Sequence, residues 1–249
     1  MKRLDLRLVE LGLAPTRSKA QKLIEAGEVE IESAGGWKTA NQSSLDTTSF
    51  TTQQIRVSDS AQTLRYVSRG GLKLEKALDH LQLVVDRSTT VLDVGLSTGG
   101  FSDCLLQRGA GAVIGIDVGH GQLAASLASD PRLKSYEGLH IKELESDTDL
   151  VEQIRRTVTL CVVDVSFISL TQIFPVLARV LPARTRLLAL VKPQFEVGLR
   201  KLDAELFPEV QAQILLEAKK CGFSIQEYFA SGLKGQDGNQ EFFVYGTRD

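Results

Sequence analysis

The stretch Val91-Leu92-Asp93-Val94-Gly95-Leu96-Ser97-Thr98-Gly99-Gly100-Phe101 decides the fold of this chain. It begins as an apolar segment typical of a buried strand, continues as a turn of small residues, and ends where a helical pattern starts. Glycines let a backbone approach a ligand closely, and the N-terminus of the next helix offers free N–H groups. A second apolar segment, Ala112–Asp117, ends in a carboxylate that can accept hydrogen bonds from ribose hydroxyls. The stretch therefore predicts a ligand-binding strand–turn–helix unit.

Several interpretations compete for this turn. A nicotinamide dinucleotide site needs Gly-x-Gly-x-x-Gly, but Ser97 stands where the second glycine belongs. Residues 95–99 match the Gly-x-Ser-x-Gly of serine hydrolases, but no histidine follows His140 to complete a triad. S-adenosylmethionine (SAM) is the third candidate, since Asp93 and Asp117 suit a ligand with a cationic methionine end and an adenosine end. A turn that serves only strand–helix packing is the fourth.

The rest of the chain predicts two domains, residues 1–62 and 63–249. In the first, a helix with Leu4 and Leu8 inward, a helix that stops at Gly27, and short strands near residues 29–31 and 55–57 precede a polar linker. In the second, apolar runs of strand length occupy residues 90–94, 112–117, 160–165, 187–191 and 242–246. Helical patterns occupy residues 72–81, 101–108, 123–128, 150–156, 170–181 and 204–221. This alternation predicts an α/β fold with a mainly parallel sheet and helices on both faces.

Composition limits the class of protein. The chain has 249 residues, a formal charge of −2 and 43% hydrophobic residues, which is enough to bury a core and excludes a disordered chain. The charge is unevenly distributed. Residues 1–24 hold six Lys or Arg against two Asp or Glu, and residues 65–76 hold four against one. The near-neutral total is therefore compatible with a nucleic-acid partner.

Cysteine usage and hydropathy indicate the compartment. Cys104, Cys161 and Cys221 are far apart in sequence and form no Cys-x-x-Cys pair, which is typical of reduced thiols and offers no metal cluster. No apolar run reaches the roughly 18 residues of a membrane span, and the first residues lack a secretory pattern. We therefore expect a cytoplasmic protein with no membrane contact and no metal site.

Four charged residues stand at the ends of predicted elements, where packing alone does not require them. Lys73 opens a predicted helix, Asp164 and Lys192 end predicted strands, and Glu241 starts the last strand. In an open α/β sheet, ligands bind at the carboxyl ends of the strands, which is where Asp164 and Lys192 project. Taken singly, each of the four is compatible with an ordinary solvated charge.

In that order, Lys73, Asp164, Lys192 and Glu241 resemble the Lys-Asp-Lys-Glu tetrad of FtsJ-like RNA ribose 2′-O-methyltransferases. The longer stretches that resemble the TlyA-type haemolysin and rRNA methyltransferase family are residues 66–74, 93–111, 117–123 and 191–198. The N-terminal part resembles that family's S-four (S4) RNA-binding domain. The resemblance covers nearly the whole chain and implies a Rossmann-like SAM-dependent methyltransferase domain after a small α+β S4 domain.

The resemblance implies methyl transfer from SAM to the ribose 2′-hydroxyl of a nucleotide, a cytidine in that family, in ribosomal RNA or ribosomal subunits. Lys192 would accept the hydroxyl proton and Asp164 would orient Lys192, while Lys73 and Glu241 would position the ribose. The residues expected to hold SAM are Asp93, Gly95, Ser97, Gly99, Gly100 and Asp117. Among these, Asp93 would support the turn and Asp117 would bind the ribose of SAM.

Six basic residues are candidates for contacts with RNA phosphates, and they are Arg3, Arg7, Arg17, Lys19, Lys22 and Arg69. Two positions depart from the family pattern. Leu96 replaces a small residue, so it either crowds the SAM pocket or packs behind the turn, and residues 28–37 lack the usual Asn-Gly turn. Two alternative functions are a membrane-active haemolysin, a label that the family carries, and an RNA-binding relative without catalysis.

Overall fold

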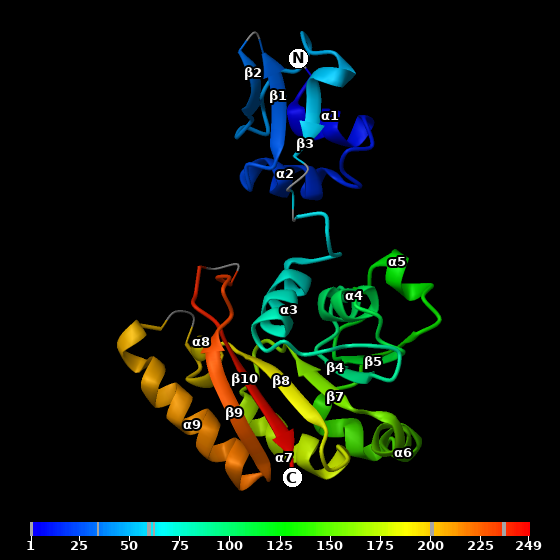
Figure 1. Ribbon diagram of the computed structural model, residues 1–249, viewed down its shortest axis with the longest axis vertical. Coiled ribbons are helices and arrows are strands. Elements are labelled where there is room, and N and C mark those ends of the chain that lie inside the picture. Colours follow the sequence, from blue (N-terminus) through cyan, green and yellow to red (C-terminus); the bar gives the residue numbers. More distant parts are fainter. Residues whose placement is uncertain (1, 34, 59–60, 62, 200–201, 236–237) are drawn as a thin grey trace. The chain divides into compact units, whose positions relative to one another are not determined.

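The computed structural model describes residues 2–33, 35–58, 61, 63–199, 202–235 and 238–249 (Figure 1). Contacts divide the chain into two units, Met1–Arg69 and Gly70–Asp249. The division follows the predicted domain end at residue 62 by a few residues. One physical reason is Lys19, whose ammonium group donates to the carbonyl oxygens of Thr63 and Tyr66 at 3.1 and 3.0 Å and so ties this segment to the first unit.

The first unit packs two helices beside a small sheet. Its elements are α1 (Leu4–Glu10), α2 (Arg17–Glu25), β1 (Val29–Ser33), β2 (Gly36–Thr39), the 3-10 turn η1 (Thr52–Gln54) and β3 (Ile55–Val57). The strands are antiparallel in the order β2-β1-β3. Leu4, Leu8, Leu23 and Ile24 are buried together, which confirms the predicted apolar faces of the two helices. Although residues 28–37 lack the family's turn, β1 and β2 pair from Glu30↔Thr39 to Ser33↔Gly36.

The second unit is built on a seven-stranded sheet. Its strands are β4 (Thr90–Val94), β5 (Ala112–Asp117), β6 (Leu133–Glu137), β7 (Leu160–Val163), β8 (Arg186–Val191), β9 (Phe223–Ala230) and β10 (Phe242–Arg248). Their order is β6-β5-β4-β7-β8-β10-β9, with β10 antiparallel to both neighbours and the five strands from β6 to β8 parallel. Figure 1 shows β10 between β8 and β9. The predicted mainly parallel sheet is confirmed.

Helices cover both faces of this sheet. They are α3 (Arg69–His80), α4 (Gly100–Gln107), α5 (Ala125–Ala128), α6 (Thr148–Thr157), α7 (Leu170–Val180), α8 (Pro193–Glu196) and α9 (Phe207–Lys220), with 3-10 turns η2 (Ile141–Ser146) and η3 (Ala204–Leu206). Side chains of α6, α7 and α9 share one core cluster with the sheet. Phe101 of α4 stacks on Phe243, which points to the opposite face. Within the described residues, no helix is long and apolar enough to span a membrane.

The structure corrects two sequence predictions. The strands β6 and β9 were not predicted, because an edge strand is half-exposed and shows no continuous apolar run. Lys73 does not open its helix, because α3 begins at Arg69 and Lys73 lies one turn further on. Gly70 and Gly71 are accommodated within the first turn of α3, so this glycine pair does not stop the helix.

Candidate active site

The glycine-rich turn joins β4 to α4 along a path that requires glycine at two positions. Gly95 has φ +91°, and a Cβ there would lie 2.3 Å from the carbonyl oxygen of Asp164. Gly99 is the N-cap residue of α4 with φ +90°, and a Cβ there would lie 2.4 Å from a methyl group of Leu127. Since Gly99 has no side chain to cap α4, the first N–H groups of Gly100 and its neighbours face the turn.

Asp117, at the tip of β5, ties the second strand to the turn. Its two carboxylate oxygens accept hydrogen bonds from the backbone N–H groups of Ser97 and Gly119, each at 2.7 Å. Each oxygen keeps a further lone pair for a ligand hydroxyl. Ser97 adopts φ +46°, and its hydroxyl donates to Gln122 at 3.1 Å.

These contacts argue against the other interpretations of the turn. The hydroxyl of Ser97 bonds an amide oxygen, so the contacts of a serine nucleophile with a histidine are absent among the described residues. The dinucleotide-binding sheet has six parallel strands, whereas here the antiparallel β10 is inserted between β8 and β9. The turn and sheet therefore favour the SAM interpretation.

Asp93 lies beneath the turn rather than at its surface. The side chain is fully buried, and one carboxylate oxygen accepts a hydrogen bond from the Ser102 hydroxyl at 2.6 Å. Burial raises the pKa of Asp93 to about 7, and the charge of Asp164 acts in the same direction. The other oxygen, Oδ1, has no hydrogen-bond partner among the described residues. Asp93 thus supports the turn by holding the first turn of α4 against β4.

Leu96 packs behind the turn. Its side chain is buried, and its Cδ atoms lie 2.7 and 2.8 Å from the position that a Cβ of Gly115 would occupy on β5. The larger side chain is therefore accommodated because Gly115 leaves space for it, and it lies against the sheet. Of the two alternatives for Leu96, the structure favours packing.

Lys192 and Asp164 form an ion pair at the carboxyl ends of β8 and β7. The ammonium nitrogen of Lys192 lies 2.6 Å from Oδ1 of Asp164 and donates a hydrogen bond to the Ser166 hydroxyl at 3.1 Å. The pairing of β7 with β8 brings these residues together, since parallel strands end at the same edge. The structure thus brings together two of the four dispersed residues.

Lys73 and Glu241 form the second pair, from α3 and the segment before β10. Their charged atoms are 2.5 Å apart, and both side chains are buried. A Cβ on Gly235 would lie 2.7 Å from the Glu241 carboxylate, so the absence of a side chain at Gly235 lets its backbone lie close over this carboxylate. The register Phe242↔Val191 puts Glu241 beside Lys192 along the sheet. The four predicted residues therefore meet as two ion pairs on adjacent strand ends.

Three residues at this edge were not predicted. Ser166 contacts Lys192, and Phe167 is 90% exposed at φ +65° with its ring 5.1 Å from the ring of Phe195. Glu196 is half-buried at the end of α8. An aromatic residue in the polar turn four positions after the end of β7 was the signal that could have indicated Phe167.

Arg3 and Arg17 converge on one buried carboxylate in the first unit. Arg3 donates two hydrogen bonds to Asp5 at 3.0 Å, and Arg17 donates one at 3.0 Å. Gln21 donates another to Asp5 at 3.0 Å. The Arg3 hydrogen bonds hold the pKa of Asp5 well below its ordinary range, with further contributions from Arg17 and Gln21. The two guanidinium groups are therefore fixed side by side where α1 meets α2.

The other candidate RNA contacts are in different situations. Arg7 pairs with Glu10 at 3.0 Å, and Lys19 binds the backbone carbonyls described above. Lys22 is exposed on α2, and Arg69 is exposed at the start of α3. In the described part of the chain, no group of three or more His, Cys, Asp or Glu is arranged to hold a metal ion.

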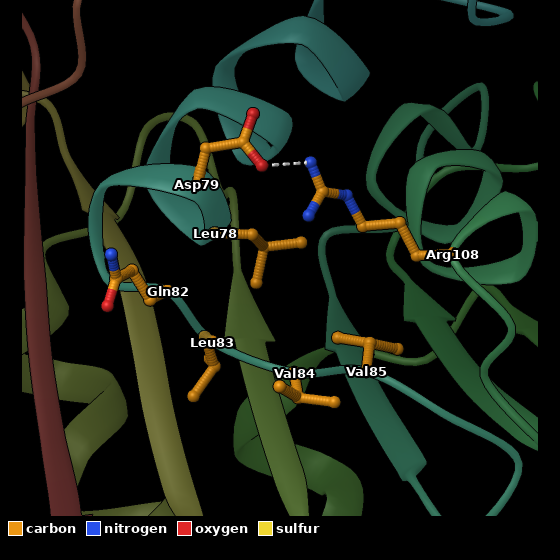
Figure 2. Close-up of a pocket in the computed structure, with 7 residues that line it drawn as sticks. All are labelled: Leu78, Asp79, Gln82, Leu83, Val84, Val85 and Arg108. Carbon is orange, nitrogen blue, oxygen red and sulfur yellow. Dashed lines mark hydrogen bonds and ion pairs between the residues drawn. The ribbon is translucent and has the colours of Figure 1, made fainter.

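A separate hollow of about 420 Å³ lies at the opposite, amino edge of the parallel strands (Figure 2). It is lined by Leu78, Asp79, Gln82, Leu83, Val84, Val85 and Arg108. Arg108 forms an ion pair with Asp79 at 2.5 Å on its rim. None of the predicted site residues lines this hollow.

Comparison with known proteins identifies the family. The model of the FtsJ-like methyltransferase matches residues 66–248, and the model of the S4 domain matches residues 2–32. The 16S/23S rRNA (cytidine-2′-O)-methyltransferase TlyA of Mycobacterium tuberculosis is 38% identical, covering 98% of this chain and 88% of the relative. Hemolysin A of Brachyspira hyodysenteriae is 34% identical over 98% of both chains.

A solved structure agrees with these sequence matches. A candidate hemolysin from Streptococcus thermophilus superimposes with a TM-score of 0.72 at 34% identity, covering 99% of this chain and 88% of that one. The match extends over both units of the chain, so the relationship is not confined to the sheet. The chain therefore belongs to the FtsJ-like methyltransferase family and carries an S4 domain in its N-terminal unit.

Proposed function

We propose that this protein transfers a methyl group from SAM to the ribose 2′-hydroxyl of a cytidine in ribosomal RNA, in the cytoplasm. The observation that carries the proposal is the meeting of Lys192–Asp164 and Lys73–Glu241 at adjacent strand ends, close to the glycine-rich turn. The relative TlyA, whose printed activity is cytidine-2′-O-methylation of 16S and 23S rRNA, supports the choice of target.

The turn fits the cofactor on physical grounds. Gly95, Gly99 and Gly100 leave the backbone uncovered, and the N-terminus of α4 offers N–H groups to the carboxylate of a methionine moiety. Ser97 lies in the same turn, and the tip of β5 presents the Asp117 carboxylate to a ribose. Asp93 holds this arrangement from below through Ser102. SAM, when bound, supplies an electrophilic methyl group on a positively charged sulfur, which keeps the electron pair of the broken bond.

Lys192 is the proposed base. Nζ of Lys192 would accept the proton of the 2′-hydroxyl as the methyl ether forms, so Lys192 must enter this step as the neutral amine. Asp164 holds Nζ at 2.6 Å and Ser166 accepts one of its hydrogen bonds, so the nitrogen has a fixed direction. The product is a 2′-methyl ether, and the proton leaves the Lys192 ammonium group to solvent.

Lys73 and Glu241 have a positioning role in this proposal. Their ion pair is buried, so the two side chains are held in place next to the partly exposed pair. Glu241 lies beside Lys192 in the sheet register and adds a fixed negative charge next to the base. The pair therefore stabilises the local geometry and charge around the 2′-hydroxyl.

Phe167 offers a surface for the target nucleotide. Its ring is exposed and lies beside the ring of Phe195, and an exposed aromatic face stacks on any base at about 1–3 kcal/mol. The target base must leave its stack in the RNA before its ribose can reach Lys192, and this unstacking costs free energy. Stacking of the base on Phe167 would offset part of this cost. In the S4 domain, Arg3, Arg7, Arg17, Lys19 and Lys22, together with Arg69 of α3, supply the basic groups for RNA phosphates.

The experiment is methyl transfer by the purified full chain with isotopically labelled SAM and ribosomal RNA or subunits that lack the modification. Digestion to nucleosides and mass spectrometry then locate the label. The proposal predicts label on the ribose of cytidine. Label on a base, or none with any rRNA form, would contradict it.

The relatives named as hemolysins provide a second test. Purified protein is incubated with red cells, with the Lys192→Ala variant alongside it. Under the proposed function, the protein does not lyse cells. Lysis that survives the substitution would support a membrane-active protein instead.

A further inference from the structure

Glu196 is a half-buried carboxylate just beyond the reacting residues, and the reaction described above gives it no role. It ends α8, the single turn that follows Lys192. One carboxylate oxygen accepts the backbone N–H of Leu170 at 3.1 Å, and the other accepts a hydrogen bond from the Ser169 hydroxyl. Ser169 is the N-cap residue of α7. A residue of the segment after β8 therefore holds the start of the helix after β7.

Two hydrogen bonds stabilise the Glu196 carboxylate. Burial raises the pKa of Glu196, while the bonds from Ser169 and Leu170 act in the opposite direction. No Lys or Arg in the described ranges forms an ion pair with it, and the positive end of α7 is the nearest source of favourable charge. An apolar residue would fill this space without the cost of burying a carboxyl group. The two hydrogen bonds are therefore what this side chain specifically provides.

The segment 164–169 is attached to the segment 192–196 at both ends. At the first end, Lys192 contacts Asp164 and Ser166. At the second end, Glu196 contacts Ser169 and Leu170 as described. The two attachments enclose only a few residues, so the path of the intervening backbone is closely restricted.

Phe167 lies between these attachments in a backbone conformation that is unfavourable for a non-glycine residue, at φ +65°. Such a conformation is strained and persists only where the surroundings hold it. The Phe167 ring has 90% of its surface exposed, so side-chain packing is a weak constraint. The two attachments, together with the packing of Val165 and Ile168 on the core, restrain the backbone on either side of Phe167.

We infer that Glu196 is a positioning residue for methyl transfer, which through Ser169 and Leu170 fixes the segment that carries Asp164, Ser166 and Phe167 against Lys192. The inference rests on the proposed function, because it concerns the same reaction. Without this attachment, the segment keeps its contacts with Lys192, the Phe167–Phe195 ring contact and the packing of Val165 and Ile168 on the core, but it loses the restraint at its second end. Lys192 and Phe167 are then no longer held in a fixed position relative to each other, while the glycine-rich turn after β4 keeps its own contacts.

Three variants separate the hydrogen bonds from the charge. Glu196→Ala removes both bonds. Glu196→Gln keeps an oxygen for the Leu170 N–H and a donor for Ser169, so it tests whether hydrogen bonding is sufficient. Ser169→Ala removes one of the two bonds to Glu196, together with the contacts that the Ser169 hydroxyl makes with the backbone N–H and the hydroxyl of Thr171. Glu209→Ala, at an exposed glutamate of α9, is the matched control.

The readout is single-turnover methyl transfer to rRNA at saturating SAM and RNA, with the amplitude and the rate constant measured separately. A purely structural defect lowers the amplitude, because fewer molecules are folded, but leaves the rate constant of the folded molecules unchanged. The inference predicts a rate constant reduced about ten-fold or more in Glu196→Ala, consistent with small misplacements of reacting groups. Ser169→Ala should show a smaller loss, and Glu196→Gln should stay within about three-fold of wild type.

SAM affinity, measured by calorimetry, should change less than two-fold or so in all variants, because the attachment lies away from the turn on β4. A wild-type rate constant in Glu196→Ala would overturn the inference, and so would a Glu196→Gln variant as slow as Glu196→Ala. If Glu196→Ala does not fold, Ser169→Ala and Glu196→Gln decide by the same criterion. If the wild-type protein itself places no methyl group on ribose, the proposed function fails, which is a distinct outcome.

Discussion

The two lysine–carboxylate pairs of the candidate active site, Lys192–Asp164 and Lys73–Glu241, have nearly the same distance between their charged atoms, but they differ in exposure. The exposed fractions of the two lysine side chains are similar, at 11% for Lys73 and 12% for Lys192. The exposed fractions of the two carboxylate side chains differ, at 4% for Glu241 and 21% for Asp164. Lys192 also contacts the exposed Ser166, whereas Glu241 is covered by Gly235. The exposure of the carboxylates therefore distinguishes a partly exposed pair, which contains the proposed base, from a buried pair, for which we propose a positioning role.

The largest expected effect is on the accessible pair. Lys192→Ala removes the proposed base and should reduce the single-turnover rate by roughly 10²–10⁴-fold, the usual contribution of a positioned base. SAM affinity should stay close to wild type. Lys220→Ala, on an exposed surface ion pair, is the control. A transfer rate within a few-fold of wild type in Lys192→Ala would show that the base assignment is wrong.

The buried pair should affect stability more than the accessible pair does. Lys73→Ala leaves the Glu241 carboxylate buried without its partner, at a cost of about 3–5 kcal/mol in unfolding free energy. Lys192→Ala leaves a carboxylate that water can reach, so its cost should be clearly smaller. Denaturant unfolding measures both. Equal losses in the two variants would remove the distinction between the pairs, and the double variant Lys73→Met with Glu241→Gln should recover much of the loss.

A third carboxylate, Asp93, extends the comparison to a group that has no cationic partner. Its pKa is raised to about 7 by burial, above the ordinary 3.8, so the folded state binds its proton more tightly than the unfolded state. The unfolding free energy should therefore fall as pH rises between these values and level off above about pH 7. Asp93→Asn removes this titration.

Relative to wild type, Asp93→Asn should gain about 2–3 kcal/mol of unfolding free energy between pH 5 and pH 8. Unfolding in denaturant at the two pH values measures this difference, with Asp203→Asn, an exposed aspartate, as control. A difference that does not change with pH would mean that Asp93 is ionised in the folded protein throughout this range.

The smallest effect is expected for substitution of Asp117, and it should be confined to the affinity for SAM. Its carboxylate is held by two backbone N–H groups, and Asp117→Ala removes one ligand acceptor together with the link between β5 and the turn. SAM affinity should weaken about ten-fold, which corresponds to the loss of one or two hydrogen bonds to a charged group. Isothermal titration measures it. Unchanged affinity would exclude Asp117 from the cofactor site.

The glycine-rich turn, Asp164 and Lys192 could be singled out from the sequence because they follow strands with clear apolar runs. Lys73 lies within α3 and Glu241 precedes β10, so their assignment to the same site depended on the family resemblance. The pairing of the four residues into one accessible and one buried ion pair was not predictable, because it depends on the register of β8 with β10 and on the coverage that Gly235 allows. The edge strands β6 and β9 escaped prediction because their exposed positions are polar. Glu196 also escaped, since its partners belong to a different strand–helix connection.

The most direct measurement of the central claim is a map of 2′-O-methyl groups in ribosomal RNA from cells with the gene, without it, and with the Lys192→Ala variant in its place. The proposed function predicts at least one cytidine that is ribose-methylated with the wild-type gene and unmodified in the other two strains. Identical maps in all three strains, or a change only in base methylation, would contradict it.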